Sequence, residues 1–349
     1  MTAPPVRWPA VLTHLLHGED LSEAEAAEVL GAVMRGEAEP SQVAALLVAL
    51  RAKGESGAEI AGFVRSMLAE AEPLSLGDDL AGAVVDTCGT GGDGAGTFNI
   101  STVAALVVAA AGRPVAKHGN RAASGTCGSA DLLEAWGIAI DLPPAQVAVC
   151  LEELGIGFLY ARSFHPAMRH VAGVRVQLGI RTVFNLLGPL SNPARAPFQV
   201  VGVSDLRLAP VMAEALARLG AKRAMVFRGD DGLDELTTTA TSQVWEVRDG
   251  RVTPGRLDPA ELGLPRATLD DLRGGGVEEN VAIADAVLAG ESGPRADVVA
   301  LNAGAALFVA GDVADLPAGI ARARDVLVDG SARALRDRWV ARSTELAHR

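Results

Sequence analysis

The stretch VVDTCGTGGDG at residues 84–94 decides the fold prediction, because a short apolar run leads directly into a glycine-rich turn. An apolar helical run follows at residues 102–111, as expected when a buried strand is connected to a covering helix. Further strand-like runs stand at residues 114–116 and 223–227, and a helical run stands at residues 208–219. Alternating strands and helices predict an α/β fold with a mostly parallel central sheet, whose ligands bind in loops at the carboxyl ends of the strands.

The first 72 residues carry helical signals only, with apolar residues at helical spacing behind each start signal. We therefore predict a small all-helical domain at residues 1–75 and a larger α/β domain at residues 76–349. Serines that precede these runs are predicted to cap free amides at the helix starts, two of them in capping boxes with a glutamate three positions later. The predicted caps are Ser22 (with Glu25), Ser41 (after Pro40) and Ser56 (with Glu59).

Composition excludes several classes of protein. The formal net charge of −12 opposes binding to nucleic acid, which normally requires a basic surface. Cys88, Cys127 and Cys150 are too widely spaced for a zinc site or a disulfide framework, which fits a reducing cytoplasm. The N-terminus lacks a signal-peptide pattern, and the longest strongly apolar run, residues 103–111, is too short to span a bilayer. We expect a cytoplasmic protein that binds neither nucleic acid nor membrane.

The glycine-rich loop at residues 89–94 literally fits G-x-G-x-x-G, the dinucleotide-binding pattern. That interpretation fails, because the loop continues to Asn99 before a helix begins, and residues 95–130 offer no acidic side chain to hold a ribose. What remains is a set of exposed amides beside a helix N-terminus that carries Ser101 and Thr102, which together favour a phosphate site. A flexible turn is the alternative.

A second loop candidate, residues 117–129, begins KHGNR and continues with serines and glycines. Lys117 offers a point charge and Arg121 a planar fork for phosphate oxygens, although a solvated basic turn would look the same. Residues 94–130 and 154–204 contain no Asp or Glu, so the chain has a segregated positive region despite its overall acidity. Its basic residues are Arg113, Lys117, Arg121, Arg162, Arg169, Arg175, Arg181 and Arg195.

Arg175 is the most informative member of this region. It shares a helical stripe with Met168, Val171 and Leu178, so its charge must find an anion or remain costly to bury. A substrate carboxylate is one candidate anion. A salt bridge to a distant carboxylate, or a stem that extends to water, is the alternative.

Negative charge is concentrated once, in Asp230, Asp231, Asp234 and Glu235, directly after a predicted strand. Magnesium prefers one or two carboxylates together with phosphate oxygens and water. An acidic turn exposed to solvent is the usual alternative. The position of these four carboxylates at a strand end, in a chain with two phosphate-like loops, favours a magnesium site.

These motifs, in this order, resemble the anthranilate phosphoribosyltransferase family. The resemblance extends from the helical start to the last helix, and many ordered matches make it specific. Beyond the loops already quoted, it rests on FHPAM at residues 164–168, on Arg175, on FNLLGPLSNP at residues 184–193, on Asp234-Glu235 and on Glu279-Asn280. The family's fold, a helical domain beside an α/β domain of the nucleoside phosphorylase/phosphoribosyltransferase type, implies that a segment near residues 165–185 returns to the helical domain.

The resemblance implies that the chain transfers the phosphoribosyl group of phosphoribosyl pyrophosphate to anthranilate in tryptophan biosynthesis, as a homodimer with two Mg²⁺ ions per active site. His118, Asn120 and Arg175 would be catalytic. Gly89, Asn120, His165 and Arg175 would bind anthranilate, and Ser101, Asp234 and Glu235 would bind metal. Phosphoribosyl pyrophosphate would contact Gly89, Gly92, Asp93, Thr97, Asn99, Ile100, Ser101, Thr102, Lys117, His118, Gly119, Asn120, Arg121, Ala122, Ala123, Ser124, Gly125 and Ser129. A pyrimidine nucleoside phosphorylase and a noncatalytic nucleic-acid-binding relative of the same fold are the alternatives.

Overall fold

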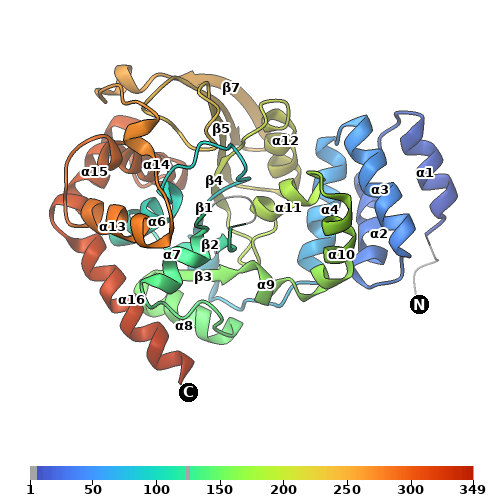
Figure 1. The fold of residues 1–349 in the computed structure, drawn as a ribbon, viewed down its shortest axis with the longest axis horizontal. Helices are drawn as coiled ribbons and strands as arrows, with labels where there is room; N and C mark the ends of the chain where they lie inside the picture. Colours follow the sequence, from blue (N-terminus) through green and yellow to red (C-terminus); the bar gives the residue numbers. More distant parts are fainter. Residues whose placement is uncertain (1–5, 123–125, 349) are drawn as a thin grey trace.

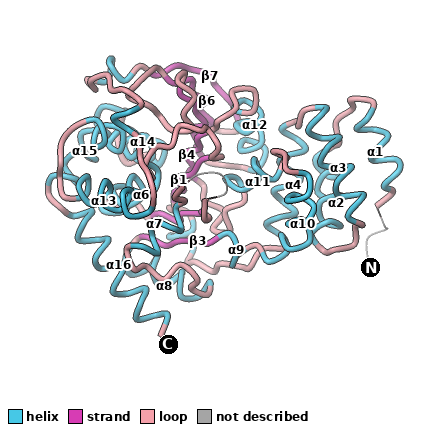
Figure 2. The backbone as a smooth tube through the Cα atoms, in the orientation of Figure 1, coloured by secondary structure: helices cyan, strands magenta, loops and turns pink. Residues whose placement is uncertain are grey.

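A seven-stranded sheet with the order β3-β2-β1-β4-β5-β6-β7 forms the centre of the molecule in a computed structural model that describes residues 6–122 and 126–348 (Figure 2). The first five strands in this order are parallel, and β6 and β7 extend the sheet as an antiparallel pair. The predicted mostly parallel sheet is therefore confirmed. The strands are β1 (Val85–Gly89), β2 (Val115–Gly119), β3 (Ile156–Tyr160), β4 (Phe198–Gly202), β5 (Arg223–Gly229), β6 (Ser242–Arg248) and β7 (Arg251–Leu257).

Helices cover both faces of this sheet, as the alternating pattern predicts (Figure 1). One face packs against α6 (Ile100–Ala110) and α14 (Pro294–Ala310), and the other carries α11 (Phe184–Leu190) and α12 (Ala209–Leu219). The remaining elements around the sheet are α5 (Asp78–Ala81), α7 (Ser129–Ala135), α8 (Pro144–Leu154), α9 (Ala161–Phe164), η2 (Pro259–Leu262), η3 (Asp270–Leu272), α13 (Val277–Leu288), α15 (Leu316–Val328) and α16 (Ser331–Ala347).

A bundle of helices stands beside the sheet (Figure 1). It consists of α1 (Trp8–Leu16), α2 (Glu23–Met34), α3 (Pro40–Lys53) and α4 (Gly57–Ala69), joined by α10 (Arg169–Leu178) after the short turn η1 (Pro166–Met168). Val171 and Val174 of α10 are buried in the same apolar core as α2 and α3. This core continues through α11 and α12 to the sheet, so the bundle and the sheet share packed contacts. No helix among the described residues is long and apolar enough to cross a membrane.

The helix starts test the predicted caps. Ser22 with Glu25 and Ser56 with Glu59 form the expected capping boxes at α2 and α4. The prediction for Ser41 is wrong, because α3 begins at Pro40 and its N-cap position falls on Glu39, two residues earlier than predicted. Proline is well suited to the first helical position, where a missing N–H costs nothing.

Candidate active site

The loops after β1 and β5 meet at the carboxyl edge of the sheet and are tied by hydrogen bonds. The amide of Gly91 donates to Oδ2 of Asp234 at 2.6 Å, and the amide of Ser101 donates to Oε1 of Glu235 at 3.1 Å. The amide of Thr90 donates to the carbonyl of Gly202, at the end of β4. The predicted phosphate loop and the predicted acidic metal loop therefore lie side by side.

Glycine is required where these loops approach one another. A Cβ on Gly202 would lie 1.6 Å from the carbonyl oxygen of Asp234, and one on Gly89 would lie 2.5 Å from its carboxylate. Gly92 has a φ of +74°, a left-handed conformation that other residues rarely adopt, and a Cβ there would meet the guanidinium of Arg181. These glycines let backbone and carboxylates converge at one point.

Asp234 and Glu235 lie in an environment that disfavours their negative charge. Burial, and then the neighbouring charge of Asp93, raise the pKa of Asp234, while burial and Asp234 raise the pKa of Glu235 to about 8. Two carboxylates that repel each other beside the hydroxyl of Ser101 form an all-oxygen donor set that a hard cation would stabilise. Among the described residues no group of three or more His, Cys, Asp or Glu side chains could hold a metal ion. Mg²⁺ commonly takes one or two carboxylates together with phosphate oxygens and water.

The other two acidic residues of this loop serve its folding. Oδ1 of Asp231 accepts from the amide of Leu233 and Oδ2 from the hydroxyl of Thr237. Asp230 pairs with Arg256 at 2.6 Å and accepts from the side chain of Gln243 at the start of β6. These contacts leave Asp234 and Glu235 as the pair that faces the phosphate loop.

Lys117 brings a buried positive charge to the same edge. Its side chain is 2% exposed, and its Nζ donates to the carbonyl of Thr87 at 2.6 Å and lies 3.5 Å from Oγ of Ser101. Burial lowers the pKa of Lys117, whereas the charge of Asp86 raises it. The ammonium group therefore stands between β1 and the start of α6, near the acidic pair.

His118 and His165 form a buried edge-to-face pair with ring centroids 5.2 Å apart. Nδ1 of His118 lies 3.0 Å from the carbonyl of Gly188, which can only accept, so Nδ1 carries the hydrogen and Nε2 is an acceptor. This Nε2 is buried and has no partner among the described residues. Burial, and then the neighbouring His165, lower the pKa of His118 to about 3, so the ring is neutral at physiological pH.

Arg175 lies on α10 with its guanidinium 5.5 Å from the ring centroid of Phe184, the first residue of α11. Burial lowers its pKa, and among the described residues it has no hydrogen bond or ion pair with a carboxylate. The predicted alternative of a distant salt-bridge partner is therefore not seen in the described part of the chain. Gly188, the partner of His118, lies one helical turn further along α11, so α11 supports both side chains.

The sequence matches the glycosyl transferase family a/b domain over residues 81–333 and the helical bundle domain of the same family over residues 9–71. It is 51% identical to the anthranilate phosphoribosyltransferase of Saccharopolyspora erythraea over 344 residues, 97% of each chain, and 53% identical to that of Moorella thermoacetica, covering 93% of this chain and 95% of the relative. The chain belongs to the anthranilate phosphoribosyltransferase family. The resemblance found in the sequence is thereby confirmed.

Solved structures of this family share the fold. The crystal structure of anthranilate phosphoribosyltransferase from Thermus thermophilus is 52% identical, with a TM-score of 0.90 over 95% of this chain and 99% of that one. The Saccharomyces cerevisiae enzyme in complex with phosphoribosyl pyrophosphate and magnesium is 26% identical, with a TM-score of 0.88 over 97% and 98%. Another structure of the yeast enzyme holds 4-fluoroanthranilate. These relatives support the main interpretation and neither of the two alternatives.

The predicted basic region of this family member proves to be partly neutralised. Arg113 pairs with Asp312, and Arg121 pairs with Asp131 at 3.0 Å and Glu134 at 2.7 Å, which raises the pKa of Arg121. A segment without acidic residues therefore does not guarantee free cations, because ion-pair partners come from elsewhere in the chain.

The other predicted contacts of phosphoribosyl pyrophosphate are placed as follows. Asn99 donates from its side chain to the carbonyl of Cys127, and Ser129 donates to the carbonyl of Asn120. The amide of Ala122 donates to Asp131. Ile100 and Thr102 are buried in α6, Thr97 bridges to Arg273, and Gly119 ends β2. Ala123, Ser124 and Gly125 lie outside the described residues.

Three buried polar residues near this edge belong to the quoted motifs but were given no role from the sequence. Asp86 and Asn192 are joined by a hydrogen bond of 2.8 Å, and Asn280 of α13 donates to the side chain of Asn99 at 3.0 Å. Asp86 stood inside an apolar strand, where a charged residue could have signalled a buried partner. Nothing in the local pattern of Asn192 or Asn280 marks them.

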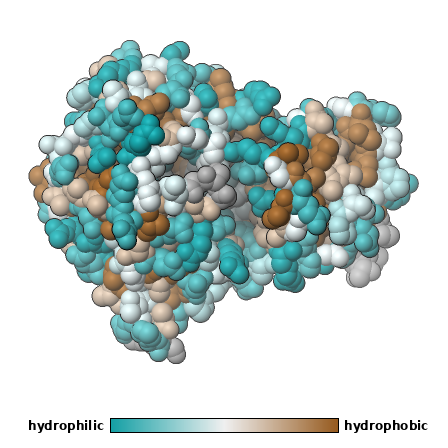
Figure 3. Space-filling model, viewed as in Figure 1, coloured by the Kyte–Doolittle hydropathy of each residue, from teal (hydrophilic) through white to brown (hydrophobic). Residues whose placement is uncertain are grey.

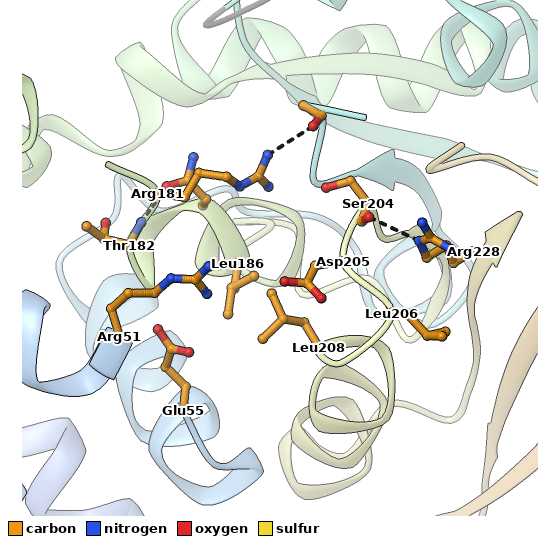
Figure 4. Close-up of a pocket in the computed structure, with 12 residues that line it drawn as sticks. Arg51, Glu55, Arg181, Thr182, Leu186, Ser204, Asp205, Leu206, Leu208 and Arg228 are labelled. Atoms are coloured by element: carbon orange, nitrogen blue, oxygen red, sulfur yellow. Dashed lines mark hydrogen bonds between the residues drawn. The ribbon is translucent and has the colours of Figure 1, made fainter. Parts of the chain in front are cut away.

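A cavity of about 410 Å³ lies between the helical bundle and the loops after β1 and β4 (Figure 4). Arg51 and Glu55 face it from the bundle, and Asp205 faces it from the loop after β4. Arg181 lines the same cavity and donates to the carbonyl of Gly91 at 3.1 Å. The glycine-rich loop is thus supported from the side of the bundle.

Proposed function

We propose that the chain transfers the 5-phosphoribosyl group of phosphoribosyl pyrophosphate to the amine of anthranilate, which yields N-(5-phosphoribosyl)anthranilate and pyrophosphate. The observation that carries the proposal is the meeting of Lys117, Glu235 and the glycine-loop amides at one edge of the sheet. The names of relatives that are more than half identical over nearly the whole chain support the same acceptor and donor.

Asp234, Glu235 and the hydroxyl of Ser101 would hold magnesium, with two ions per site as the family resemblance implies. Bound magnesium offsets the negative charge of the diphosphate and of the pyrophosphate that leaves. Lys117 adds a fixed positive charge where the negative charge of the leaving pyrophosphate grows. The amides of residues 92–94, which have no partner among the described residues, add hydrogen-bond donors. Because these groups are set by the fold before substrate arrives, little reorganisation is needed as the anomeric bond breaks.

The acceptor would lie between α10 and the loop after β2. Arg175 has a guanidinium without a carboxylate partner among the described residues, as expected of a group that binds the carboxylate of anthranilate. Asn120 is exposed directly after β2, and Nε2 of His118 is an acceptor without a partner in the described part of the chain. We propose that His118 accepts a hydrogen bond from the amine and that His165 supports its ring, which would orient the nitrogen lone pair toward the ribose.

We also propose that two copies of the chain associate through the exposed apolar face of the helical bundle. Apolar residues gather over the region of α3 and α10 in Figure 3. Val176 is 82% exposed, and Leu16, Val48 and Ile180 are also exposed on α1, α3 and the turn after α10. A patch of this kind usually marks an interface. Val176→Asp should lower the mass measured by sedimentation from dimer to monomer; a monomeric unaltered protein would refute the proposal.

The decisive experiment measures the loss of anthranilate fluorescence in the presence of phosphoribosyl pyrophosphate, first with magnesium and then with a chelator. Turnover that needs both phosphoribosyl pyrophosphate and magnesium is expected. Folded protein that binds phosphoribosyl pyrophosphate but leaves anthranilate unchanged would refute the proposed acceptor. Phosphate-dependent cleavage of pyrimidine nucleosides would support the phosphorylase alternative instead.

A further inference from the structure

Strands β1 and β2 part at the edge where the site lies. They pair at one position, Val85 with Val115, whereas β1 pairs with β4, and β2 with β3, at five positions each. Beyond Val85 the peptide groups of β2 that face β1 therefore lack strand partners. Buried peptide groups need a partner from another source.

The side chains of Asp86 and Asn192 supply these missing partners. Oδ1 of Asp86 accepts from the amide of His118 at 3.2 Å, and the Nδ2 group of Asn192 donates to the carbonyl of Ala116 at 2.7 Å. The same Nδ2 group donates to Oδ2 of Asp86 at 2.8 Å, while Oδ1 of Asn192 accepts from the amide of Ala194. The two peptide groups that flank Lys117 are thus held from one side by a single buried pair.

The pair also compensates the charge of Lys117. Asp86 is fully buried and Asn192 is 1% exposed, and the hydrogen-bonding atoms of both side chains are occupied within this network. The charge of Asp86 favours the charged form of Lys117, whose ammonium crosses the gap between the strands to the carbonyl of Thr87 at 2.6 Å. A buried ammonium without a nearby anion would be strongly disfavoured.

We propose that Asp86 and Asn192 are positioning residues for the transfer reaction, which hold Lys117 and His118 at the open end of the gap between β1 and β2. The inference rests on the proposed function, since it concerns how the same site is built. Loss of this pair should move the ammonium and the imidazole together, because both residues belong to the same held segment of β2.

The test compares Asp86→Asn in two backgrounds. Asp86→Asn turns one of the two acceptors, the one toward Asn192 or the one toward the amide of His118, into a donor and removes the compensating charge. We therefore expect kcat/KM for phosphoribosyl pyrophosphate to fall at least tenfold. In the background of Lys117→Met the same change should cost a clearly smaller factor, because one of the two groups that the pair positions is already gone. Unchanged kcat/KM in the first background, or losses that multiply fully in the second, would overturn the proposal.

Two controls separate positioning from a general loss of stability. Leu106→Ala, in the core of α6, should lower the melting temperature yet keep kcat/KM within twofold. If Asp86→Asn fails to fold, Asn192→Ala tests the same pair, because it keeps the carboxylate of Asp86 and removes the donor to the carbonyl of Ala116. It should lower kcat/KM by a larger factor in the unaltered background than in Lys117→Met; equal factors in the two backgrounds, or an unaltered kcat/KM, would refute the positioning role.

A failure of the proposed function gives a different result. In that case the unaltered protein would bind phosphoribosyl pyrophosphate without consuming anthranilate. The same comparisons can then be made with the dissociation constant of phosphoribosyl pyrophosphate, measured by calorimetry. Asp86→Asn should weaken this binding more in the otherwise unaltered protein than in Lys117→Met. An unchanged affinity in the otherwise unaltered protein, or an equal loss of affinity in the two backgrounds, would overturn the inference.

Discussion

Gly202→Ala should separate the acidic loop from the phosphate loop with one added methyl group. The new Cβ would lie 1.6 Å from the carbonyl oxygen of Asp234, whereas real Cβ atoms essentially never come closer than 3.0 Å to another heavy atom. The contact requires a movement of at least 1.4 Å, and the carbonyl oxygen of Asp234 belongs to the backbone, which cannot rotate away as a flexible side chain could. Because Asp234 and Glu235 are adjacent, both carboxylates would move.

Misplacement of about 1 Å can lower a rate on the order of 100-fold, so we expect at least that loss in kcat/KM for Gly202→Ala. Steady-state kinetics over a range of magnesium concentrations should also show a higher requirement for the ion. Gly77→Ala is the matched control, because nothing lies within 4 Å of a Cβ there and its φ is −59°. Folded Gly202→Ala protein whose kcat/KM stays within threefold of the unaltered enzyme would refute this reasoning.

Three further predictions concern single side chains. The pKa of His118 is about 3, against 6.5 in the unfolded chain, so its ring should show no titration above pH 5 by NMR. The free energy of unfolding should fall by about 2 kcal/mol between neutral pH and pH 5, because only the unfolded chain takes up the proton in this range. A midpoint above pH 5 would contradict this. Arg175→Lys should raise KM for anthranilate roughly 10- to 100-fold, because a lysine cannot bind a carboxylate in bidentate fashion, with KM for phosphoribosyl pyrophosphate nearly unchanged. An equal rise in both constants would place Arg175 elsewhere. Glu235→Gln should raise the magnesium concentration for half-maximal rate at least tenfold, and Asp230→Asn should leave it unaltered; equal effects of these two changes would contradict the assignment of ligands.

Local patterns predicted much of the fold. A short apolar strand that runs into a glycine-rich turn, as in residues 84–94, predicts parallel strands with a site at their ends. This prediction succeeds because strand length and the conformations open to glycine are determined by a few neighbouring residues. The antiparallel pair β6–β7 was not predicted, because its sequence contains Pro254 and Gly255 and is mostly exposed on β7. Such an edge pair depends on the sheet that it joins.

Predictions for the site depended on distances that a sequence does not contain. The convergence of Ser101 with Glu235 followed from the rule for strand ends. The pairing of Arg113 with Asp312, 199 positions away, could not follow from any local pattern. For the same reason the sequence did not distinguish the four carboxylates of the acidic loop, and the ion pair of Asp230 with Arg256 supports leaving Asp230 out of the proposed magnesium site.

The place of α10 in the helical bundle has a consequence for synthesis on the ribosome. Val171 and Val174 complete the apolar core of the bundle, yet they are made about 100 residues after α4 ends at Ala69. The first four helices therefore emerge with an uncovered apolar face, and they must wait for β1, β2 and β3 before α10 can cover it. We expect a nascent chain halted before residue 169 to be sensitive to protease in α2 and α3, and a chain halted well beyond residue 178 to be resistant there.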